Sequence, residues 1–127
     1  YSSAVLLDAW VQHVAQQNAD ETRERLAGSL AAQLAVLREL SVAVATRLAM
    51  GERPVVEASL VKDLGTTFEQ SVPTLIADDL ASHPDEAVDP ELWQAMMTVM
   101  HIAPAFSLRG GTREILRGIV ARGLGLR

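Results

Sequence analysis

The sequence predicts an all-α fold, specifically an antiparallel, up-and-down four-helix bundle with one short extra helix. The composition favours helices, because 49% of the residues are hydrophobic and only 4% are aromatic, with abundant alanine and leucine. Apolar residues recur every three or four positions, and no segment alternates apolar and polar residues as a half-buried strand does. A length of 127 residues fits one domain, residues 1–127, that is large enough to hold a sizeable core.

The first predicted helix covers about residues 3–18, and Trp10 and Val14 lie on its apolar face. We expect Trp10 to lie in the core. We expect His13, at the edge of this face, to be half-buried with its hydrogen bonds satisfied. The helical pattern is already in register near the start of the chain, which begins with a residue other than methionine. We therefore expect the chain to be a fragment of a longer protein.

A second helix is predicted over residues 20–50, because Asp20 is a favourable N-cap and Gly51 a favourable stop. A helix of about thirty residues is about 45 Å long, which suits the wall of a bundle or an oligomer interface. We expect most of its charged residues to be solvated. Its apolar stripe is predicted to contain Leu26, Leu30, Leu34, Leu37, Leu40, Val44 and Leu48.

The turn at residues 51–54 is short, so the helix that follows must lie antiparallel to the second one. Pro54 fits the first position of this third helix, and Pro73 is predicted to kink or interrupt it. The apolar stripe of the third helix is predicted to contain Val56, Leu60, Leu64, Phe68, Val72, Ile76 and Leu80.

Residues 82–90 are predicted to form a loop before a short fourth helix, for which Asp89 and Pro90 fit the N-cap and the first position. Acidic residues crowd this region, and carboxylates can bind divalent cations. Their spacing is loose and lacks the glycine of a calcium loop, so a solvated loop is favoured over a metal site. The fourth helix carries methionines that we interpret as core, with a promiscuous pocket as the alternative: Met96, Met97 and Met100.

Composition also excludes several classes of function. The net charge of −5 and the pI near 5.1 argue against a general nucleic-acid-binding protein. The absence of cysteine excludes disulfides and thiolate metal sites. No apolar run approaches the ~18 residues of a membrane helix, and no signal peptide is visible. We therefore expect a cytoplasmic protein without a membrane or nucleic-acid partner.

The C-terminal segment carries the candidate functional site. Gly110 and Gly111 break the chain, and Thr112 then opens a helix that its hydroxyl can cap. The free N–H groups of the first helical turn suit a phosphate or another electron-rich group, although glycine before a capping residue is also ordinary helix punctuation. Between residues 109 and 127 five arginines stand against Glu114 alone, which favours internal pairing, helix-dipole compensation or a negative ligand. The apolar face of this helix is predicted to contain Ile115, Leu116, Ile119, Val120 and Leu124.

Gly-Thr-Arg-Glu-Ile at residues 111–115 is followed by Ile-Val-Ala-Arg at 119–122 and Leu-Gly-Leu at 124–126. Together these motifs resemble the C-terminal end of acyl-CoA dehydrogenases, which carry Gly-Thr/Ser-x-Glu/Gln-Ile and Ile-x-Ala-Arg at this spacing. Ala-Ser-Leu-Val-Lys at residues 58–62 also resembles the family's Ala-Ser-x-Ala-Lys segment. The resemblance implies a divergent form of the family's C-terminal helical domain, which starts inside the first helix of the bundle.

The resemblance also implies a function for the full-length parent. In this family a carboxylate removes a proton next to the thioester carbonyl and FAD takes a hydride from the next carbon, so that acyl-CoA becomes trans-2-enoyl-CoA. Electrons then leave through an electron-transfer flavoprotein. The family's FAD contacts map onto Gly111, Thr112 and Glu114, and the bundle helices are expected to form a homo- or hetero-oligomer. The fragment alone is expected to be inactive.

Three departures from the family pattern leave a second interpretation open. Gly110 occupies the position of the catalytic glutamate in many members, so we assign no catalytic residue to this chain. The family's Arg-x-x-Phe-Gly is absent near residues 16–22, and its Gln-x-x-Gly-Gly-x-Gly is replaced by the acidic segment 78–89. The alternative is therefore a non-catalytic subunit of a heteromeric acyl-CoA dehydrogenase. A third interpretation is a helical interaction domain without a flavin.

Overall fold

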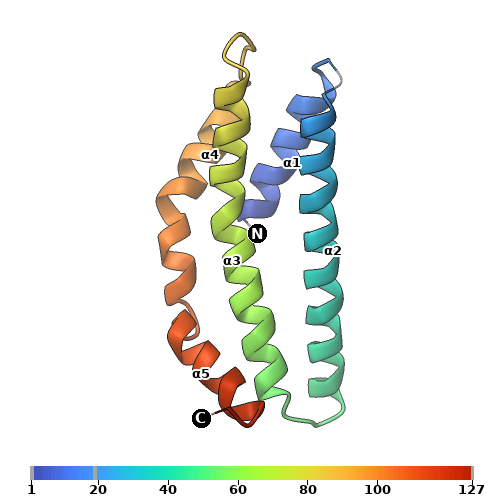
Figure 1. The fold of residues 1–127 in the computed structure, drawn as a ribbon, viewed down its shortest axis with the longest axis vertical. Coiled ribbons are helices and arrows are strands. Elements are labelled where there is room, and N and C mark those ends of the chain that lie inside the picture. The colour runs from blue at the N-terminus through green and yellow to red at the C-terminus, as the bar shows by residue number, and fades with distance from the viewer. Residues whose placement is uncertain (1, 19, 127) are drawn as a thin grey trace.

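The computed structural model describes residues 2–18 and 20–126, and within them the chain is all-α, with five α-helices, one 3₁₀ helix and no strand. Figure 1 shows two long helices side by side, with two shorter helices beside the upper part of α3 and the last helix near its lower end. The elements are α1 (Ser2–Ala15), α2 (Glu21–Ala49), α3 (Val55–Ser82), α4 (Pro90–Ile102), η1 (Ala103–Leu108) and α5 (Arg113–Gly123). The predicted all-α class is confirmed.

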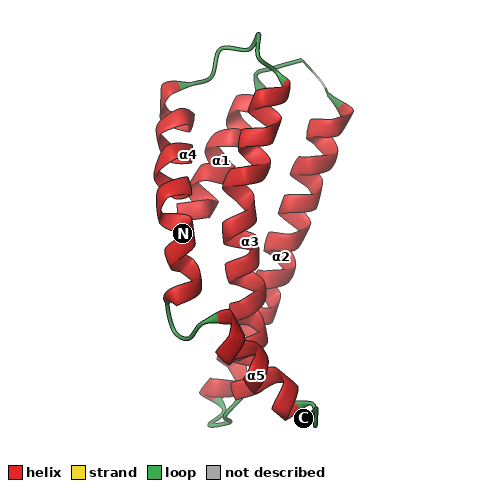
Figure 2. Cartoon of the chain, turned by 60° about the vertical axis from the view of Figure 1, so that its left-hand side comes forward, coloured by secondary structure: helices red, strands yellow, loops and turns green. Residues whose placement is uncertain are grey.

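The helix ends follow the capping chemistry that the sequence predicts. The Asp20 carboxylate accepts from the backbone N–H of Thr22 at 2.7 Å and so caps α2. After α2 the chain turns at Gly51, whose φ of +81° lies in the left-handed region that favours glycine. The Asp89 carboxylate caps α4 by accepting from the Glu91 N–H at 2.7 Å. The short α2–α3 turn makes these helices antiparallel neighbours, as Figure 2 also shows.

The sequence predicts that Pro73 kinks or interrupts α3, and the interruption is excluded because the helix continues from Val55 to Ser82. A proline lacks the N–H that would bond the carbonyl four residues earlier, which here belongs to Glu69. The buried hydroxyl of Ser3 on α1 donates to that Glu69 carbonyl at 3.1 Å. A side chain from a neighbouring helix therefore replaces the missing backbone donor.

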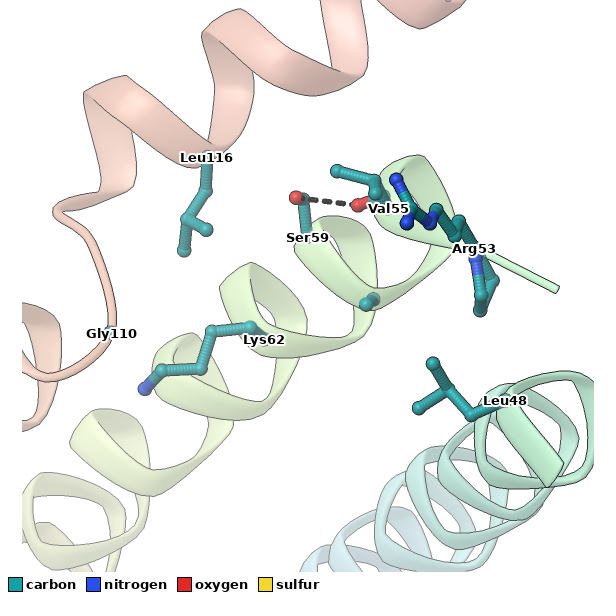
Figure 3. A pocket seen from close by; sticks show the side chains of 9 residues that line it. Leu48, Arg53, Val55, Ser59, Lys62, Gly110 and Leu116 are labelled. Carbon is teal, nitrogen blue, oxygen red and sulfur yellow. Dashed lines mark hydrogen bonds between the residues drawn. The ribbon is translucent and has the colours of Figure 1, made fainter. Parts of the chain in front are cut away.

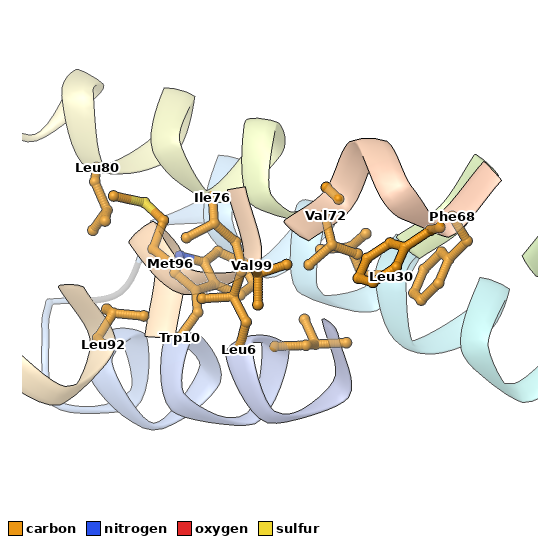
Figure 4. Packing of buried hydrophobic residues seen from close by; sticks show 13 residues of the cluster. Leu6, Trp10, Leu30, Phe68, Val72, Ile76, Leu80, Leu92, Met96 and Val99 are labelled. Atoms are coloured by element: carbon orange, nitrogen blue, oxygen red, sulfur yellow. The ribbon is translucent and has the colours of Figure 1, made fainter. Parts of the chain in front are cut away.

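The hydrophobic core lies where α1, α3 and α4 meet (Figure 4). Trp10 is fully buried at its centre, which confirms the prediction for this residue. Met96 is a core residue, whereas Met97 and Met100 are partly exposed, so the core interpretation holds for one of the three methionines. The buried apolar side chains of this cluster are Leu6, Leu7, Trp10, Leu30, Phe68, Val72, Ile76, Leu80, Leu92, Met96, Val99, Ala103 and Phe106.

Helix α2 contributes little to this core. Of the apolar stripe predicted for it, only Leu30 is buried, and Leu48 is 57% exposed. By length and composition α2 is apolar enough to cross a membrane, since an 18-residue window reaches a mean hydropathy of 1.3. Only 6% of that window is buried. The prediction that no apolar run is long enough to cross a membrane is therefore wrong for α2. A long solvent-facing apolar helix also suits a protein interface.

A buried ion network ties the N-terminal end of α2 to α1 and α3. Arg23 is 1% exposed, and its Nε donates to the Asp79 carboxylate at 2.9 Å. The indole N–H of Trp10 donates to the same carboxylate at 2.9 Å, and Arg23 Nη1 lies 2.8 Å from Oε1 of Glu86 in the α3–α4 loop. The prediction that most charged residues of the second helix are solvated does not hold for Arg23, because the fold brings opposite charges together around it.

His13 borders this network and also departs from its prediction. It is 5% exposed, and its Nε2 has no hydrogen-bond partner among the described residues. The nearest acidic group is Glu86, at 3.8 Å from Nε2. His13 is therefore more buried and less satisfied than the helical pattern predicts.

His83 links the end of α3 to the start of α2. Its Nδ1 lies 2.8 Å from the Asp79 carbonyl oxygen and its Nε2 lies 2.9 Å from Oδ2 of Asp20. A carbonyl and a carboxylate both accept hydrogen bonds, so the two contacts are best satisfied when both ring nitrogens carry a proton. The hydrogen bond to the Asp79 carbonyl, followed by that to Asp20, raises the pKa of His83. The His83 hydrogen bond and the Thr22 N–H lower the pKa of Asp20.

We predict that Arg23→Met lowers the free energy of unfolding by about 3–5 kcal/mol, because it leaves the buried Asp79 carboxylate without its cation. Urea denaturation measures this loss as a shift of the midpoint. The matched control is Arg25→Met on the same helix, which removes an exposed pair with Glu21 and should cost at most about 0.5 kcal/mol. Equal losses in both variants would contradict the role assigned to the buried network.

We predict that the His83–Asp20 contact makes stability depend on pH in two directions. Because the folded pKa of His83 is raised above 6.5, its contribution is complete below pH 6.5 and is lost as the pH rises through the folded value. Because the folded pKa of Asp20 is lowered below 3.8, its contribution is present above pH 3.8 and is lost as the pH falls through the folded value.

Thermal unfolding from pH 6 to pH 9 should therefore show a loss of stability that His83→Gln removes. His101→Gln is the control, since His101 is exposed and its Nδ1 contacts only the Met97 carbonyl among the described residues. A His83→Gln variant that keeps the full pH dependence of the parent chain would refute this assignment.

Candidate functional site

A cavity of about 350 Å³ lies beside the glycine pair, where the end of α2, the start of α3 and the Gly110 loop meet. Figure 3 shows Leu116 pointing into it from α5, and Lys62 directed from α3 toward the loop that contains Gly110. The lining is mainly apolar, with two basic side chains. The lining residues are Leu48, Arg53, Pro54, Val55, Ala58, Ser59, Lys62, Gly110 and Leu116.

The glycine pair is required by backbone conformation. Gly110 has a φ of +70° and Gly111 a φ of +106°, both in the region that disfavours side chains. The space itself is less restrictive, because a Cβ on Gly110 would lie 3.9 Å from Cε of Lys62 and one on Gly111 would lie 3.6 Å from Cδ2 of Leu116. The pair therefore forms the turn that leads from η1 into α5.

Thr112 opens α5 as predicted but does not cap it with its hydroxyl. Its backbone is extended, and its carbonyl accepts from the Leu116 N–H at 3.0 Å, whereas its side chain makes no capping hydrogen bond. The hydroxyl interacts instead with Glu114. The backbone N–H of Glu114, followed by the Thr112 hydroxyl, lowers the pKa of the Glu114 carboxyl. The prediction of a hydroxyl cap is therefore wrong. The Glu114 carboxylate accepts from the Glu114 backbone N–H more strongly than the neutral Thr112 hydroxyl oxygen would.

The three predicted cofactor-binding residues lie close together, yet none of them lines the cavity. Gly111 and Thr112 are half-buried in the turn, and Glu114 is exposed on α5. Gly110, which the motif resemblance would place at the position of a catalytic base, is the member of this segment that borders the cavity. The cavity therefore lies beside the start of α3 and not at the predicted cofactor-binding residues 111–114.

Lys62 is the best-positioned cation at this cavity. Its Nζ donates to Oγ1 of Thr66 at 2.8 Å and to the Phe106 carbonyl at 3.2 Å, so it bridges α3 and η1. Arg53 is exposed at the turn between α2 and α3 and also lines the cavity. Sequence reasoning identified the Ala-Ser-Leu-Val-Lys segment as similar to a family motif but assigned no site role to Lys62. Its hydrogen bond to η1, at the Phe106 carbonyl, depends on a tertiary contact that no motif encodes.

The position of α5 is set by Asp63 on α3. Its two carboxylate oxygens each accept at 3.0 Å, one from Nε of Arg113 and the other from Nε of Arg117. Although burial raises the pKa of Asp63, hydrogen bonds from Arg117 and Arg113 bring it below its ordinary value. This confirms internal pairing for two of the five arginines of the C-terminal segment.

The other predictions for the C-terminal segment concern its remaining arginines and the apolar face of α5. Arg109 lies with its guanidinium carbon 4.9 Å from the centre of the Phe106 ring, a cation–π contact. Arg127 lies outside the described residues. Of the apolar face predicted for α5 only Leu116 is buried, and Ile115 is 57% exposed, because α5 packs mainly on α3, near the lower end of the molecule in Figure 1.

Among the described residues no group of three or more histidine, aspartate or glutamate side chains is arranged to hold a metal ion. Comparison of the sequence with protein-family models and with curated proteins finds no match. The local motifs and the geometry around the glycine pair are therefore the features of this chain that bear on its function.

We predict that Gly123→Ala loosens α5 from α3, at a cost of about 1–3 kcal/mol. A Cβ at this position would clash with the side chain of Val56 at the start of α3. Gly118→Ala in the same helix is the control, because a Cβ there meets nothing within 4 Å, and it should stabilise by up to about 1 kcal/mol. Hydrogen exchange of the α5 amides measures both effects. Equal protection in the two variants would contradict this packing.

Proposed function

We propose that this chain is the C-terminal helical domain of an FAD-dependent acyl-CoA dehydrogenase-like protein. The full-length parent would carry out α,β-dehydrogenation of acyl-CoA thioesters in the cytoplasm and pass electrons to an electron-transfer flavoprotein. We also class the arrangement of α1 to α4 as an antiparallel, up-and-down four-helix bundle, with α5 as the short extra helix. The alternating directions of these four helices along the chain support that classification.

One observation carries the proposal. The Gly-Gly-Thr segment that resembles the family's flavin-contact motif forms a tight turn into a helix N-terminus, directly beside a mainly apolar cavity with two basic side chains, Lys62 and Arg53. A volume of about 350 Å³ lies at the lower end of the range for ligand pockets. A cavity of this size can hold one part of a flavin dinucleotide, and the remaining part of the dinucleotide would need to contact surfaces beyond this chain.

Donor groups and positive charge around the cavity suit an electron-rich ligand. The first-turn N–H groups after Thr112 suit a phosphate or a ring carbonyl, and Lys62 and Arg53 add positive charge at the cavity. The ionised Glu114 would repel a phosphate but can accept from a ribose hydroxyl or a ring N–H. When bound, FAD would supply the hydride acceptor of the reaction. The chain's own role would be to bind and orient one edge of that group.

A base is not assigned within this chain. Gly110 has no side chain, and Glu114 is exposed and held by Thr112. In family members without a glutamate at the Gly110 position, the base comes from the start of the first bundle helix. The enzyme proposal therefore requires a carboxylate that this chain does not supply.

The alternative is a non-catalytic structural subunit of a heteromeric acyl-CoA dehydrogenase. Two observations favour it: Gly110 at the family's base position, and the acidic segment 78–89, where Asp79 and Glu86 serve the buried network. Residues in that network are not free to contact a flavin. A helical interaction domain without a flavin is the third candidate, and the exposed surface of α2 supports it.

The experiment that separates these candidates is the amount of FAD bound per chain in the purified full-length protein, alone and co-expressed with a homologous subunit. One flavin per chain in a homo-oligomer supports the enzyme. No flavin alone, with flavin in the mixed complex, supports the structural subunit. Absence of flavin in both preparations would refute the proposal and leave the interaction domain.

We predict that Thr112→Val weakens FAD retention in the full-length protein roughly fivefold, since it removes one hydrogen-bonding hydroxyl worth about 1 kcal/mol. Thr98→Val is the control, because Thr98 is exposed on α4 and donates only to the Gln94 carbonyl among the described residues. Equilibrium dialysis with flavin absorbance measures both. Unchanged retention in Thr112→Val would rule out Thr112 as a flavin contact.

A further inference from the structure

A second cavity, of about 340 Å³, lies between α2 and α3 and adjoins the cavity beside the glycine pair, with which it shares Ala58 and Lys62. We call this second cavity the Gly65 groove. It is mainly apolar and has no role in the function proposed above. The residues that line it are Ser41, Val44, Ala58, Val61, Lys62, Gly65, Thr66 and Glu69.

Gly65 leaves open space in this groove near the middle of α3. A Cβ at this position would meet nothing within 4 Å, and Gly65 is not among the glycines with a positive φ. Glycine is less favourable than alanine inside a helix. Neither packing within the described chain nor backbone conformation therefore accounts for this glycine, whereas a ligand that lies against the helix would.

The Lys62 ammonium brings to the groove a positive charge that no ion pair of the described residues neutralises. Its Nζ donates to Oγ1 of Thr66 at 2.8 Å and to the Phe106 carbonyl at 3.2 Å, and both acceptors are neutral. The neighbouring carboxylate of Asp63 is paired with two arginines of α5 instead. Because an ammonium group has three N–H donors, one donor of Lys62 is left for a ligand.

Thr66 places a buried hydroxyl beside this ammonium. Thr66 is 2% exposed, and its Oγ1 accepts from Lys62, but its own O–H donates to no acceptor among the described residues. Buried polar groups normally have their hydrogen-bonding capacity met. Lys62 and Thr66 therefore present two unused donors, one N–H and one O–H, at the same point of an apolar groove.

We infer that the Gly65 groove binds a single-chain fatty-acid anion. The two oxygens of its carboxylate accept from Lys62 and Thr66, a charge-assisted arrangement. Its chain runs along α3 toward Ala58, away from Glu69, which is engaged in a contact of its own. From Thr66 to Ala58 the helix rises about 12 Å at ~1.5 Å per residue, which suits a chain of about ten carbons.

Other occupants fit the two donors less well. A neutral hydrocarbon or an apolar helix would cover the donors of Lys62 and Thr66 without supplying an acceptor, which is costly. An inorganic anion would satisfy the donors but leave the apolar length of the groove in water. A ligand with an anionic head and one apolar chain satisfies both parts of the groove.

Calorimetric titration with decanoate, below the concentration at which it forms micelles, tests the inference on the folded 127-residue chain. Decanoate should bind saturably, with one molecule per chain. Decyltrimethylammonium has a chain of the same length and a positive head, and it should not bind. The net charge of the chain is −5, so unspecific attraction would favour the cation, and a preference for decanoate reports the local charge of Lys62.

Two substitutions test the two parts of the groove. Lys62→Met should weaken decanoate binding at least about tenfold, because it removes a charge-assisted hydrogen bond. Arg25→Met, which removes an exposed cation outside the groove, is its control and should leave the affinity unchanged. Gly65→Leu fills the groove with a side chain that favours the helix and should abolish binding. Gly28→Leu is its control, because a Cβ there also meets nothing within 4 Å but lies outside the groove.

Selective acetylation locates the head group, since Lys62 is the only lysine of the sequence. Decanoate should slow the acetylation of Lys62 as measured by mass spectrometry, and decyltrimethylammonium should not. Acetylation that decanoate leaves unchanged would place the carboxylate elsewhere and contradict the inference.

Circular dichroism shows which variants are folded. A folded wild-type chain that does not bind decanoate, or that binds both probes equally, would overturn the inference, and so would a folded Gly65→Leu variant with full affinity. The comparison of the two probes uses the wild-type chain alone, so it decides the question even where a variant fails to fold. None of these readouts uses flavin, so the FAD measurement remains an independent test of the proposed function.

Discussion

The contact between Arg23 and Asp79 is the interaction on which the rest of the structure depends. A guanidinium this deeply buried needs an opposite charge close to it. Asp79 accepts from Nε of Arg23 and from Trp10, so one carboxylate joins α1, α2 and α3, and Glu86 accepts from Nη1. Among the described residues Nη2 of Arg23 has no hydrogen-bond partner. Because the apolar core lies directly beside it, this network fixes the relative positions of the helices around Trp10.

Helix α3 is the element against which the others are placed. It contacts α1, α2, α4, η1 and α5, and it reaches both ends of the molecule. Even its proline is accommodated by a neighbour, since Ser3 supplies the hydrogen bond that Pro73 removes. The half of α3 that ends at Ser82 packs into the hydrophobic core and the ion network. The half that begins at Val55 borders the cavity beside Lys62 and the exposed part of α2.

This asymmetry shapes the functional proposals. The glycine pair lies near the start of α3, where Asp63 holds α5 on α3 and a cavity remains between α2, α3 and α5. At the other end of α3, Asp79 and Glu86 accept hydrogen bonds from Arg23 and Asp20 pairs with His83, so these three carboxylates are committed to contacts within the chain. A small cavity beside the glycine pair and a long helix whose apolar side chains are largely exposed are both consistent with a domain that acts as part of an assembly.

The sequence by itself determined the helical class, the helix ends at Asp20, Gly51 and Asp89, and the burial of Trp10. These features depend on local periodicity and capping, which adjacent residues encode. Only the tertiary structure decided that Arg23 and Asp79 are buried, that Pro73 leaves α3 continuous, and that Thr112 serves Glu114. Each of these depends on a partner supplied by the folded geometry, and for Arg23 that partner lies 56 residues away in sequence. The apolar stripe of α2 shows the same limit, because periodicity identifies an apolar face but not whether this chain or another covers it.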